Sequence, residues 1–542
     1  MKRALDTPGD LDITRTRSGT GESPLSPIEF LARAVANWPR RTAVATDQGD
    51  RTYAELGDRV SRIVGLLHGL DAQPQDRVVV ILENSPEMIE LHFGVIAAEC
   101  VIVPLNSRLT QDEYTYILGH CEPLLVVSAA SLVDTVSAAL QASSSKAKVL
   151  VVDDEEPISS YEQGIRDADP HVLTVPEELS MLSINYTSGT TGRPKGVIYT
   201  HRGAYLQSLG VIAETGLTST AGYLWTLPMF HCHGWSFIWA VTAVGATHYC
   251  CGPFEPGRVW KLLTQKSISH LCCAPTVLTM LLSHNDARPV GRQVSVFVGG
   301  APPTPSLLAR AEDVGVQVTQ MYGLTETYGP VAVCHVRPDW DDFSDEEVFR
   351  LRARQGVGTA ATLPIRVVDV DGGHVPADGQ TIGEVIVSGN TVTSGYFRDG
   401  AATAGAIVNG WFHSGDLAVM HEDGYIELRD RAKDLIITGG ENVSTIEVEQ
   451  ALTAHPDVVE AAALGVPDDL WGEMVIAVVR TVEGSGETES SLREFARKRL
   501  APFKVPKRII FRGVLPTTAT GKIRKFDLRA EFHNESPMLP GR

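Results

Sequence analysis

The chain has 542 residues, more than one hydrophobic core usually supports, so its length predicts two or more domains. Its 47 basic residues against 66 acidic residues give a formal net charge of −19. This balance argues against a nucleic-acid-binding surface and favours a soluble protein with local basic patches at anionic ligands. Eight cysteines without C-x-x-C spacing indicate buried free thiols in a reducing compartment, so we expect a cytoplasmic protein.

No apolar run reaches the roughly 18 residues of a membrane-spanning helix, so no membrane span is predicted. Residues 1–26 are polar and rich in Ser, Thr, Gly and Pro. That composition predicts a disordered tail that is neither a signal peptide nor an anchor.

The first globular stretch begins with apolar residues spaced 4, 3 and 4 apart, which marks one face of a helix. These residues are Leu56, Val60, Ile63 and Leu67. Buried strands are predicted at 77–82, 101–104, 124–127 and 149–152, with a helix that begins at Ser85-Pro86. The alternation predicts an α/β fold in which the N-terminal half is a layered α/β domain with parallel strands.

The run Tyr186-Thr187-Ser188-Gly189-Thr190-Thr191-Gly192-Arg193-Pro194-Lys195-Gly196 combines glycines, hydroxyls and one cation. Glycines allow close backbone approach and hydroxyls donate hydrogen bonds, so the run can wrap a polyphosphate. The spacing G-x-x-x-x-G-K-[ST] fails around Lys195, which weakens a kinase or GTPase interpretation; a flexible surface loop is the simpler alternative. The run resembles the signature of the adenylate-forming superfamily, which includes acyl-CoA synthetases, peptide-synthetase adenylation domains and luciferases. The resemblance extends from roughly Pro27 to Leu528.

The resemblance implies a large ATP- and acyl-binding domain at 27–430 and a small mobile α+β lid domain at 431–542. It also implies ATP, Mg²⁺ and coenzyme A as cofactors. In the phosphate loop, the residues expected to bind ATP are Thr187, Ser188, Gly189, Thr190, Thr191, Gly192 and Lys195. Glu326 and Thr187 are the expected metal-binding residues, and a carboxylate beside phosphate oxygens suits Mg²⁺.

Residues 228–235 are dense in aromatic rings and imidazoles. A metal site at His231 and His233 lacks a third ligand nearby. The segment resembles the acyl-pocket wall of fatty-acid and related acyl-CoA ligases, in which the Trp is a pocket gate. The implied acyl-binding residues are Met229, His231, His233 and Trp235.

Two strands, 294–298 and 316–320, each run into a loop, and such loops meet at the carboxyl ends of parallel strands. The resemblance implies that Tyr322 stacks on the base, that Thr325 bonds the α-phosphate and that Glu326 holds Mg²⁺. Capping of a turn is the structural alternative for Tyr322 and Glu326. The remaining implied residues are Gly300, Ala301, Pro302 and Gly323 at the nucleotide, and Gly299 and Met321 at the acyl group.

A carboxylate in a Gly-containing turn at 411–417, Asp416, suits two sugar hydroxyls. By resemblance, Asp416 binds the ribose, Arg431 contacts the nucleotide and Lys433 is the hinge. Ser414 stands where Thr is commoner in the family.

The last part of the chain predicts a small α+β unit. A capping box at 444–447 opens a helix, a strand is expected at 475–479, and Leu492, Phe495 and Leu500 lie on another helix. By resemblance, pantetheine meets Gly439, Gly440 and Glu441, and Lys522 is the catalytic lysine. An ordinary solvated lysine is the alternative.

The implied chemistry has two steps. A carboxylate attacks the α-phosphate to give an acyl-adenylate and pyrophosphate, with Lys522, Lys195 and Mg²⁺ offsetting the charge and Thr325 and Glu326 in catalytic roles. A lid rotation about Lys433 then exposes the adenylate to a thiol.

We therefore predict an ATP-dependent acyl-CoA ligase for a short- to medium-chain, small aryl or thioether carboxylic acid. The alternatives are an adenylation protein that loads a carrier-protein thiol and a nucleotide-binding sensor without catalysis. A homodimer is left open.

Overall fold

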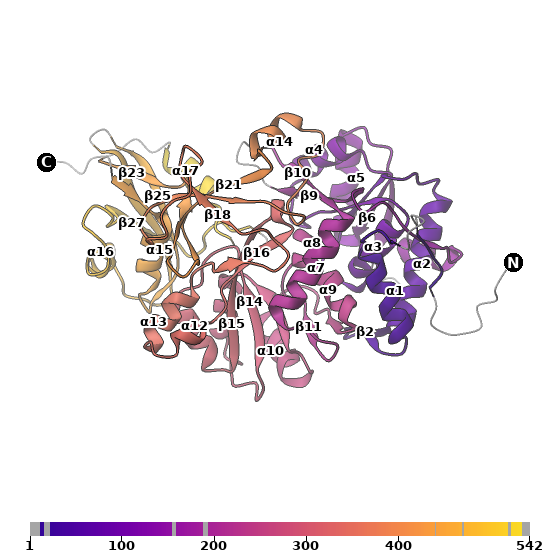
Figure 1. Ribbon diagram of the computed structural model, residues 1–542, viewed down its shortest axis with the longest axis horizontal. Coiled ribbons are helices and arrows are strands. Elements are labelled where there is room, and N and C mark those ends of the chain that lie inside the picture. The colour runs from indigo at the N-terminus through magenta and orange to yellow at the C-terminus, as the bar shows by residue number, and fades with distance from the viewer. Residues whose placement is uncertain are drawn as a thin grey trace.

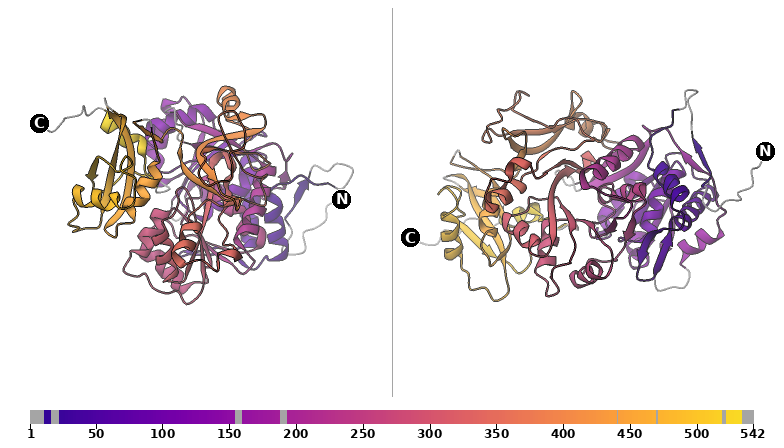
Figure 2. Two further views of the ribbon diagram at one scale, coloured as in Figure 1. Left: turned by 60° about the vertical axis from the view of Figure 1, so that its left-hand side comes forward. Right: turned by 60° about the horizontal axis from the view of Figure 1, so that its bottom comes forward.

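The computed structural model describes residues 11–15, 22–153, 159–187, 193–439, 441–468, 471–518 and 522–533. Helices and mixed sheets form a large N-terminal domain and a smaller C-terminal domain, the latter drawn in yellow at the left of Figure 1. The two further views in Figure 2 keep the C-terminal domain against one end of the larger domain. The predicted α/β class with a small C-terminal domain is confirmed.

The first sheet is built around the parallel strands that the β-branched runs predicted. β4 pairs in parallel with β5 and β6, and β9 and β10 form an antiparallel hairpin at one edge. In spatial order the strands are β10 (Lys195–Thr200), β9 (Met181–Thr187), β5 (Val101–Pro104), β4 (Arg77–Ile81), β6 (Leu125–Ala129) and β7 (Lys148–Val152). The helices in this part of the chain are α2 (Tyr53–Gly69), α3 (Pro86–Ala97), α4 (Gln111–Cys121), η1 (Ala130–Leu132), α5 (Val133–Ala142) and α6 (Ser160–Asp167).

Helix α2 follows the predicted spacing, because its four apolar residues are at most 1% exposed and face the core. The helix begins at a capping box in which Thr52 and Glu55 bond each other's backbone. Ser85 likewise caps α3, whose first residue is Pro86, as predicted.

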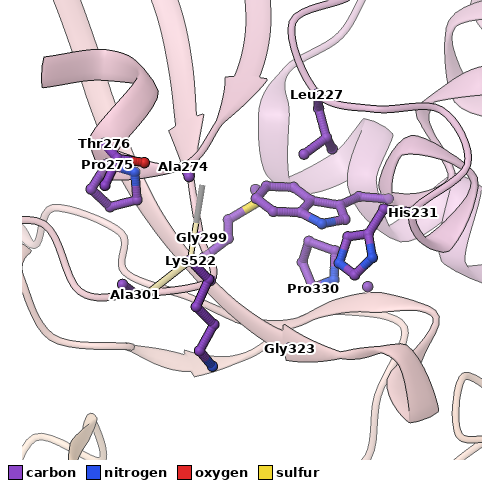
Figure 3. Close-up of a pocket in the computed structure, with 14 residues that line it drawn as sticks. Leu227, His231, Ala274, Pro275, Thr276, Gly299, Ala301, Gly323, Pro330 and Lys522 are labelled. Atoms are coloured by element: carbon purple, nitrogen blue, oxygen red, sulfur yellow. The ribbon is translucent and has the colours of Figure 1, made fainter. Parts of the chain in front are cut away.

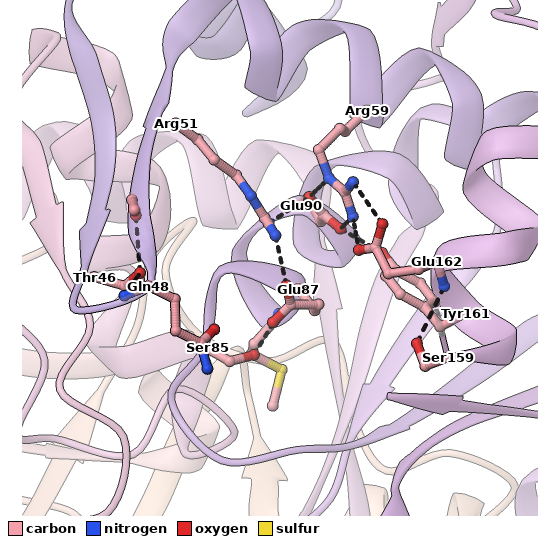
Figure 4. Close-up of polar contacts among 12 residues, drawn as sticks. Thr46, Gln48, Arg51, Arg59, Ser85, Glu87, Glu90, Ser159, Tyr161 and Glu162 are labelled. Carbon is pink, nitrogen blue, oxygen red and sulfur yellow. Dashed lines mark hydrogen bonds and ion pairs between the residues drawn. The ribbon is translucent and has the colours of Figure 1, made fainter. Parts of the chain in front are cut away.

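A buried ion network joins α2, α3 and α6 (Figure 4). Arg59 Nε lies 2.5 Å from Glu90 and its Nη2 lies 2.6 Å from Glu162. Arg51 Nη2 lies 2.8 Å from Glu87. The three carboxylates lie within 4.8 Å of one another, but two guanidinium groups already pair with them. The network therefore ties the three helices together through paired charges.

The second sheet carries the cavity described below. Its central strands β11 to β15 run parallel, and β16 and β17 continue it antiparallel. In spatial order the strands are β17 (Val357–Gly358), β16 (Gly329–Val333), β15 (Val316–Leu324), β14 (Val294–Val298), β13 (His270–Cys273), β11 (Gly222–Leu224), β12 (Thr247–Tyr249), β2 (Thr42–Thr46) and β3 (Gly49–Thr52). The associated helices are α1 (Ile28–Asn37), α7 (His201–Thr215), α8 (Cys232–Trp235), α9 (Phe237–Val244), α10 (Pro256–Gln265), α11 (Pro275–Leu282), α12 (Pro305–Glu312), η2 (Thr325–Thr327), η3 (Pro338–Trp340) and α13 (Asp345–Arg352).

Two predicted irregular segments are strands instead. β15 continues through Met321 to Leu324, because these residues pair with β16, and a short η2 turn follows. Residues 411–417 belong to β21, although Gly415 does adopt a positive φ of 70°. The third sheet comprises β18 (Arg366–Val368), β19 (Gly383–Val387), β21 (Trp411–Met420), β20 (Ile407–Val408) and β22 (Ile426–Arg431), with α14 (Gly400–Ala406) beside it.

The C-terminal domain has its own core, which begins at Ile436 and packs one sheet against helices. Ser444 caps α15 as predicted, but Leu500 lies beyond the end of α16 rather than on it. The strands are β24 (Glu441–Val443), β23 (Ile436–Thr438), β26 (Gly472–Thr481), β25 (Val458–Asp468) and β27 (Arg508–Phe511). The helices are α15 (Thr445–Thr453), α16 (Glu489–Arg497) and α17 (Lys525–His533).

The expected tail at 1–26 is partly ordered. β1 (Ile13–Arg15) pairs in parallel with β8 (Leu173–Val175), and Ser26 is fully buried. The prediction of disorder is wrong for these residues, because a short backbone pairing and a buried hydroxyl outweigh a polar composition. The predicted free thiols are confirmed, since all eight cysteines are buried and unpaired.

Candidate active site

A cavity of about 90 Å³ lies beyond the carboxyl ends of β13 and β14, between the two domains (Figure 3). Strand β15 and the turn after residue 230 close its other sides. The lining residues are Leu227, His231, Trp235, Ala274, Pro275, Thr276, Gly299, Gly300, Ala301, Met321, Gly323, Gly329, Pro330 and Lys522. The carboxyl-end position is the one that an open parallel sheet offers to a ligand.

Glycines let the cavity walls approach closely. A Cβ at Gly299 would lie 2.7 Å from the Trp235 ring and 2.9 Å from the Met321 carbonyl oxygen. A Cβ at Gly323 would lie 1.9 Å from the Gly329 carbonyl oxygen. Both contacts are too short for any side chain, so the glycines are required by the packing of Trp235 and by the β15–β16 pairing.

The turn that follows His231 and carries Trp235 is left-handed. Cys232, His233, Gly234, Trp235 and Ser236 all have φ between 50° and 66°. The Ser236 N–H donates to the Cys232 carbonyl at 3.1 Å, closing a single left-handed helical turn. Such a conformation costs an L-residue roughly 1–2 kcal/mol, so the surrounding packing must hold it.

His233 does not line the cavity. Its ring is fully buried, with Nε2 at 2.7 Å from Ser183 Oγ and 3.0 Å from Asn185 Nδ2. Burial lowers the pKa of His233 well below its usual value, so the ring is neutral. The predicted acyl contact of His233 is therefore not provided by this arrangement, in which the left-handed turn directs the ring into the core.

Met229 also lies outside the cavity lining. It is fully buried, and its backbone N–H donates to Asn84 Oδ1 at 2.7 Å. We infer that Met229 fixes the start of the segment, whereas Leu227, in the loop after β11, supplies the lining surface.

Tyr322, Asp416 and Arg431 form one constellation. The Tyr322 hydroxyl donates to Asp416 Oδ2 at 2.8 Å, and Arg431 Nε lies 3.0 Å from Asp416 Oδ1. Asp416 and Arg431 are directly opposite each other on β21 and β22. Burial and the neighbouring Asp416 carboxylate raise the pKa of Tyr322, so its hydroxyl stays protonated. The structure thus joins three residues whose predicted ligand is one nucleotide.

Glu326 and Lys195 meet at a tyrosine that the sequence analysis missed. Glu326 Oε1 accepts a hydrogen bond from the Tyr396 hydroxyl at 2.9 Å, and Lys195 Nζ lies 4.9 Å from the centre of the Tyr396 ring. Thr187 lies directly opposite Lys195 in the β9–β10 hairpin. Tyr396 follows a Gly-containing loop with no motif signal of its own, and only the fold brings it here.

Thr325 is almost buried beside the left-handed turn. Its hydroxyl accepts a 3.6 Å contact from Cys232 Sγ, and its carbonyl accepts the Tyr199 hydroxyl at 2.7 Å. These contacts fix the start of η2, and Glu326 follows Thr325 in that turn.

Lys522 reaches the cavity from the C-terminal domain, although its side chain keeps much exposed surface (Figure 3). The Thr518 N–H donates to the Lys522 carbonyl at 2.7 Å, which fixes the backbone of Lys522. The nearby positive charge of Arg431 lowers the pKa of Lys522 to about 8.

Other predicted site residues stand apart from this cavity. Gly439 directly follows β23 and Glu441 begins β24. Lys433 lies exposed between β22 and β23. Pro302 follows Ala301 without lining the cavity. The predictions for Ser188, Gly189, Thr190, Thr191, Gly192 and Gly440 lie outside the described residues.

Sequence reasoning missed Ala274, Pro275 and Thr276. They follow β13 directly, as residues 299–301 follow β14. Ligands in open parallel sheets bind beyond the carboxyl ends of the strands, so these residues would have been predicted if 270–273 had been recognised as a strand. Within the described ranges, no helix combines the length and the apolar composition needed to cross a bilayer.

Known proteins share this architecture. The AMP-binding enzyme family matches residues 31–397, and the AMP-binding enzyme C-terminal domain matches residues 447–522. The chain is 39% identical over 531 residues to 4-hydroxybutyrate–CoA ligase 2 of Metallosphaera sedula, covering 95% of this chain and 96% of that protein. It is 36% identical over 543 residues to peroxisomal trans-cinnamate:CoA ligase of Petunia hybrida, covering 95% of each. Its structure resembles ATP-bound MatB from Rhodopseudomonas palustris with a TM-score of 0.83 and 29% identity, over 94% of this chain and 99% of that one.

The family match spans more than half of the chain, and both relatives are aligned over nearly their whole lengths. The resemblance to adenylate-forming enzymes is thereby confirmed. The chain belongs to the AMP-binding enzyme family and is an AMP-forming acid–thiol ligase.

Proposed function

We propose that this ligase converts a small carboxylic acid, ATP and CoA into an acyl-CoA, AMP and pyrophosphate through an acyl-adenylate. The observation that carries the proposal is the position of Lys522 at the cavity that Trp235 and Gly299 enclose. A cation beside an acyl-sized cavity is what attack of a carboxylate on a phosphate requires.

In the adenylation step the carboxylate would lie between Lys522 and the α-phosphate. Lys522 would orient the carboxylate and offset the charge that develops on the phosphoryl oxygens. Asp416 has one oxygen on Tyr322 and one on Arg431, which presents its carboxylate in a fixed orientation for the ribose hydroxyls. Thr325 is the residue proposed for the α-phosphate.

Glu326 and Thr187 are the residues proposed to hold Mg²⁺. Glu326 suits a hard cation, because only its Oε1 is bound to Tyr396 and one carboxylate among phosphate oxygens is the usual Mg²⁺ environment. When bound, the ion would neutralise phosphate charge. Lys195, near the same tyrosine, supplies a further positive charge.

For the second step we propose a rotation of the C-terminal domain, with the domain boundary between Asp430 and Arg431 and the hinge at Lys433. Rotation would withdraw Lys522 and bring residues 439–441 to the pantetheine arm. Gly439 suits a close approach of the pantetheine arm to the backbone. Its φ is 59°, which favours glycine, and its N–H donates to the Trp471 carbonyl at 2.7 Å, which fixes the turn.

The proposed acid is short- to medium-chain, small aryl or thioether. The cavity supports this class, because Trp235 closes it and small or apolar residues line it. The relatives named for 4-hydroxybutyrate and trans-cinnamate also act on acids of this size.

The experiment measures pyrophosphate release over a panel of such acids, with CoA, with a phosphopantetheine-bearing carrier protein, and with neither. We expect slow release with the acid alone and sustained release when CoA is added. Stimulation by the carrier protein but not by CoA would favour the alternative function. A wild-type enzyme that releases pyrophosphate with no acid of the panel would contradict the proposed substrate class.

The cytoplasm remains the proposed compartment, supported by the buried free thiols, although one relative is named as peroxisomal. A homodimer is the proposed assembly, and light scattering of the purified protein tests it.

A further inference from the structure

Lys525 lies three residues after Lys522, at the start of α17, outside the motif that drew attention to Lys522. Its amine donates to Thr445 Oγ1 at 2.6 Å and pairs with Glu449 Oε1 at 2.6 Å. Both partners belong to α15, and the Lys525 side chain is only 17% exposed. The anchor formed by Lys525, Thr445 and Glu449 therefore fixes the backbone that precedes Lys525.

The anchor continues into the last strand of the N-terminal domain. The Thr445 hydroxyl donates to Asp430 Oδ1 at 3.0 Å, and the Thr445 N–H donates to Asp430 Oδ2 at 2.5 Å. Thr445 is fully buried and Asp430 is 3% exposed. One hydroxyl therefore accepts from Lys525 and donates to Asp430, linking β22 to α17 across the proposed hinge.

The Glu449 end of the anchor is also fixed. Glu449 Oε1 accepts the Ala463 N–H at 2.8 Å, so the carboxylate that holds Lys525 is tied to β25. Between the anchor and the cavity, the Arg524 N–H donates to the Pro516 carbonyl at 2.8 Å. Little free backbone separates Lys525 from Lys522.

We propose that Lys525 is a positioning residue for adenylation: with Thr445, Glu449 and Asp430, it holds the backbone of Lys522 where that residue lines the cavity. The proposal rests on the role of Lys522 in the proposed function. Lys525 touches neither substrate nor reacting atom, so it acts through the place of Lys522. The Asp430–Thr445 link must break when the domain rotates, so the same network favours the adenylating arrangement.

The test substitutes Lys525→Met, which keeps the length of the side chain and removes its charge. A misplacement of about 1 Å can cost up to ~100-fold in rate, so we expect adenylation kcat to fall by about 10- to 100-fold. The KM values for ATP and the acid should change little, because neither substrate touches Lys525. Thioester formation from a supplied acyl-adenylate should keep its rate. Lys525→Arg, which can still donate to both partners, should restore most of the activity.

Lys504→Met is the matched control. Lys504 pairs at 2.7 Å with Glu447, which also lies on α15, and its side chain is 23% exposed, but Lys504 is not in the segment that carries Lys522. This variant should adenylate at the wild-type rate. Equal losses in Lys504→Met and Lys525→Met would overturn the proposal, since they would indicate a general requirement for lid ion pairs.

A double mutant separates positioning from stability. In the Lys522→Ala background, Lys525→Met should cause no further loss of adenylation, because the residue being positioned is gone. A full additional loss would overturn the proposal. If Lys525→Met does not fold, Thr445→Val breaks the same link and should show the same kinetic pattern; a folded Thr445→Val with wild-type adenylation would also overturn it.

The outcome is separable from that of the proposed function. If Lys522→Ala itself adenylates normally, the role of Lys522 is wrong. If Lys522→Ala is impaired but Lys525→Met is not, only the positioning role fails.

Discussion

The amine of Lys522 lies near another fixed cation, Arg431, and this proximity affects its charge. The neighbouring positive charge lowers its pKa to about 8, from an ordinary value above 10. The protonated form, which the proposed role of Lys522 in adenylation needs, is therefore complete below about pH 7 and is lost as the pH rises through 8.

We expect kcat/KM for adenylation to fall as the pH rises past about 8, because kcat/KM reports the free enzyme. Lys522→Arg keeps its charge at every accessible pH and should lose this alkaline limb, even if its activity is lower. Rates of pyrophosphate release measured from pH 6 to 10 test the expectation. An identical limb in Lys522→Arg would assign the titration to another group.

Trp235 occupies space that a longer acyl chain would need. Its ring lies against Gly299 and closes the cavity, so Trp235→Ala should shift the optimum in kcat/KM toward longer acids. Each buried methylene is worth ~0.8 kcal/mol, or roughly 3–4-fold. Shorter acids should lose by a similar factor, because a cavity would remain beside them.

The measurement compares kcat/KM for acids from butyrate to palmitate in wild type and Trp235→Ala. Trp411→Ala, on β21 and outside the cavity lining, is the control and should keep the wild-type optimum. An unshifted optimum with an altered rate in Trp235→Ala would support a gate to a tunnel already open to long chains.

At the scale of elements, the left-handed turn Cys232–Ser236 places the Trp235 side chain on the cavity and the His233 ring in the core. Gly234 is its tightest point, since φ is 57° and a Cβ would lie 2.2 Å from the Trp225 ring. Trp225 is itself fully buried and cannot move away freely.

Gly234→Ala should therefore destabilise the fold by roughly 2–5 kcal/mol, combining left-handed strain with overpacking. A lowered thermal unfolding midpoint is the expected result. Gly400→Ala, at a position with open space and no positive φ, is the matched control and should melt like wild type. A midpoint for Gly234→Ala equal to that of the control would contradict the rigid turn.

The strands at 321–324 and 411–417 were expected as irregular segments because each contains glycine beside polar residues. In the fold, Gly323 serves strand pairing, because it permits the close approach of β16, whereas Gly415 adopts a positive φ of 70°. Local composition could not show this, because the partner strand begins at Gly329 after an intervening turn.

At the scale of the whole molecule, the proposed mechanism requires two arrangements of the domains, and this structure has Lys522 at the cavity. Lys433→Pro would fix φ near −65° at the proposed hinge. Adenylation should persist, because this arrangement needs no further rotation, whereas thioester formation should fall by a large factor.

Separate assays of pyrophosphate release and of thioester formation from supplied acyl-adenylate test this expectation. Lys433→Ala, which leaves the backbone free to rotate, should retain both half-reactions. Thioester formation at the wild-type rate in Lys433→Pro would rule out rotation about this residue.

The sequence by itself determined the fold class and the four parallel strands β4 to β7 of the first sheet, and it supplied the proposed nucleotide-binding residues. These follow from local signals in the sequence, namely the apolar periodicity of 56–67, the β-branched runs and the short motifs around Lys195, Glu326, Asp416 and Lys522. Tertiary structure decided which side chains meet. Tyr396 joins Glu326, Lys525 reaches Thr445 and His233 turns into the core through contacts between segments far apart in the chain. Side-chain direction depends on backbone handedness and on partners distant in sequence, and neither is encoded in a local pattern.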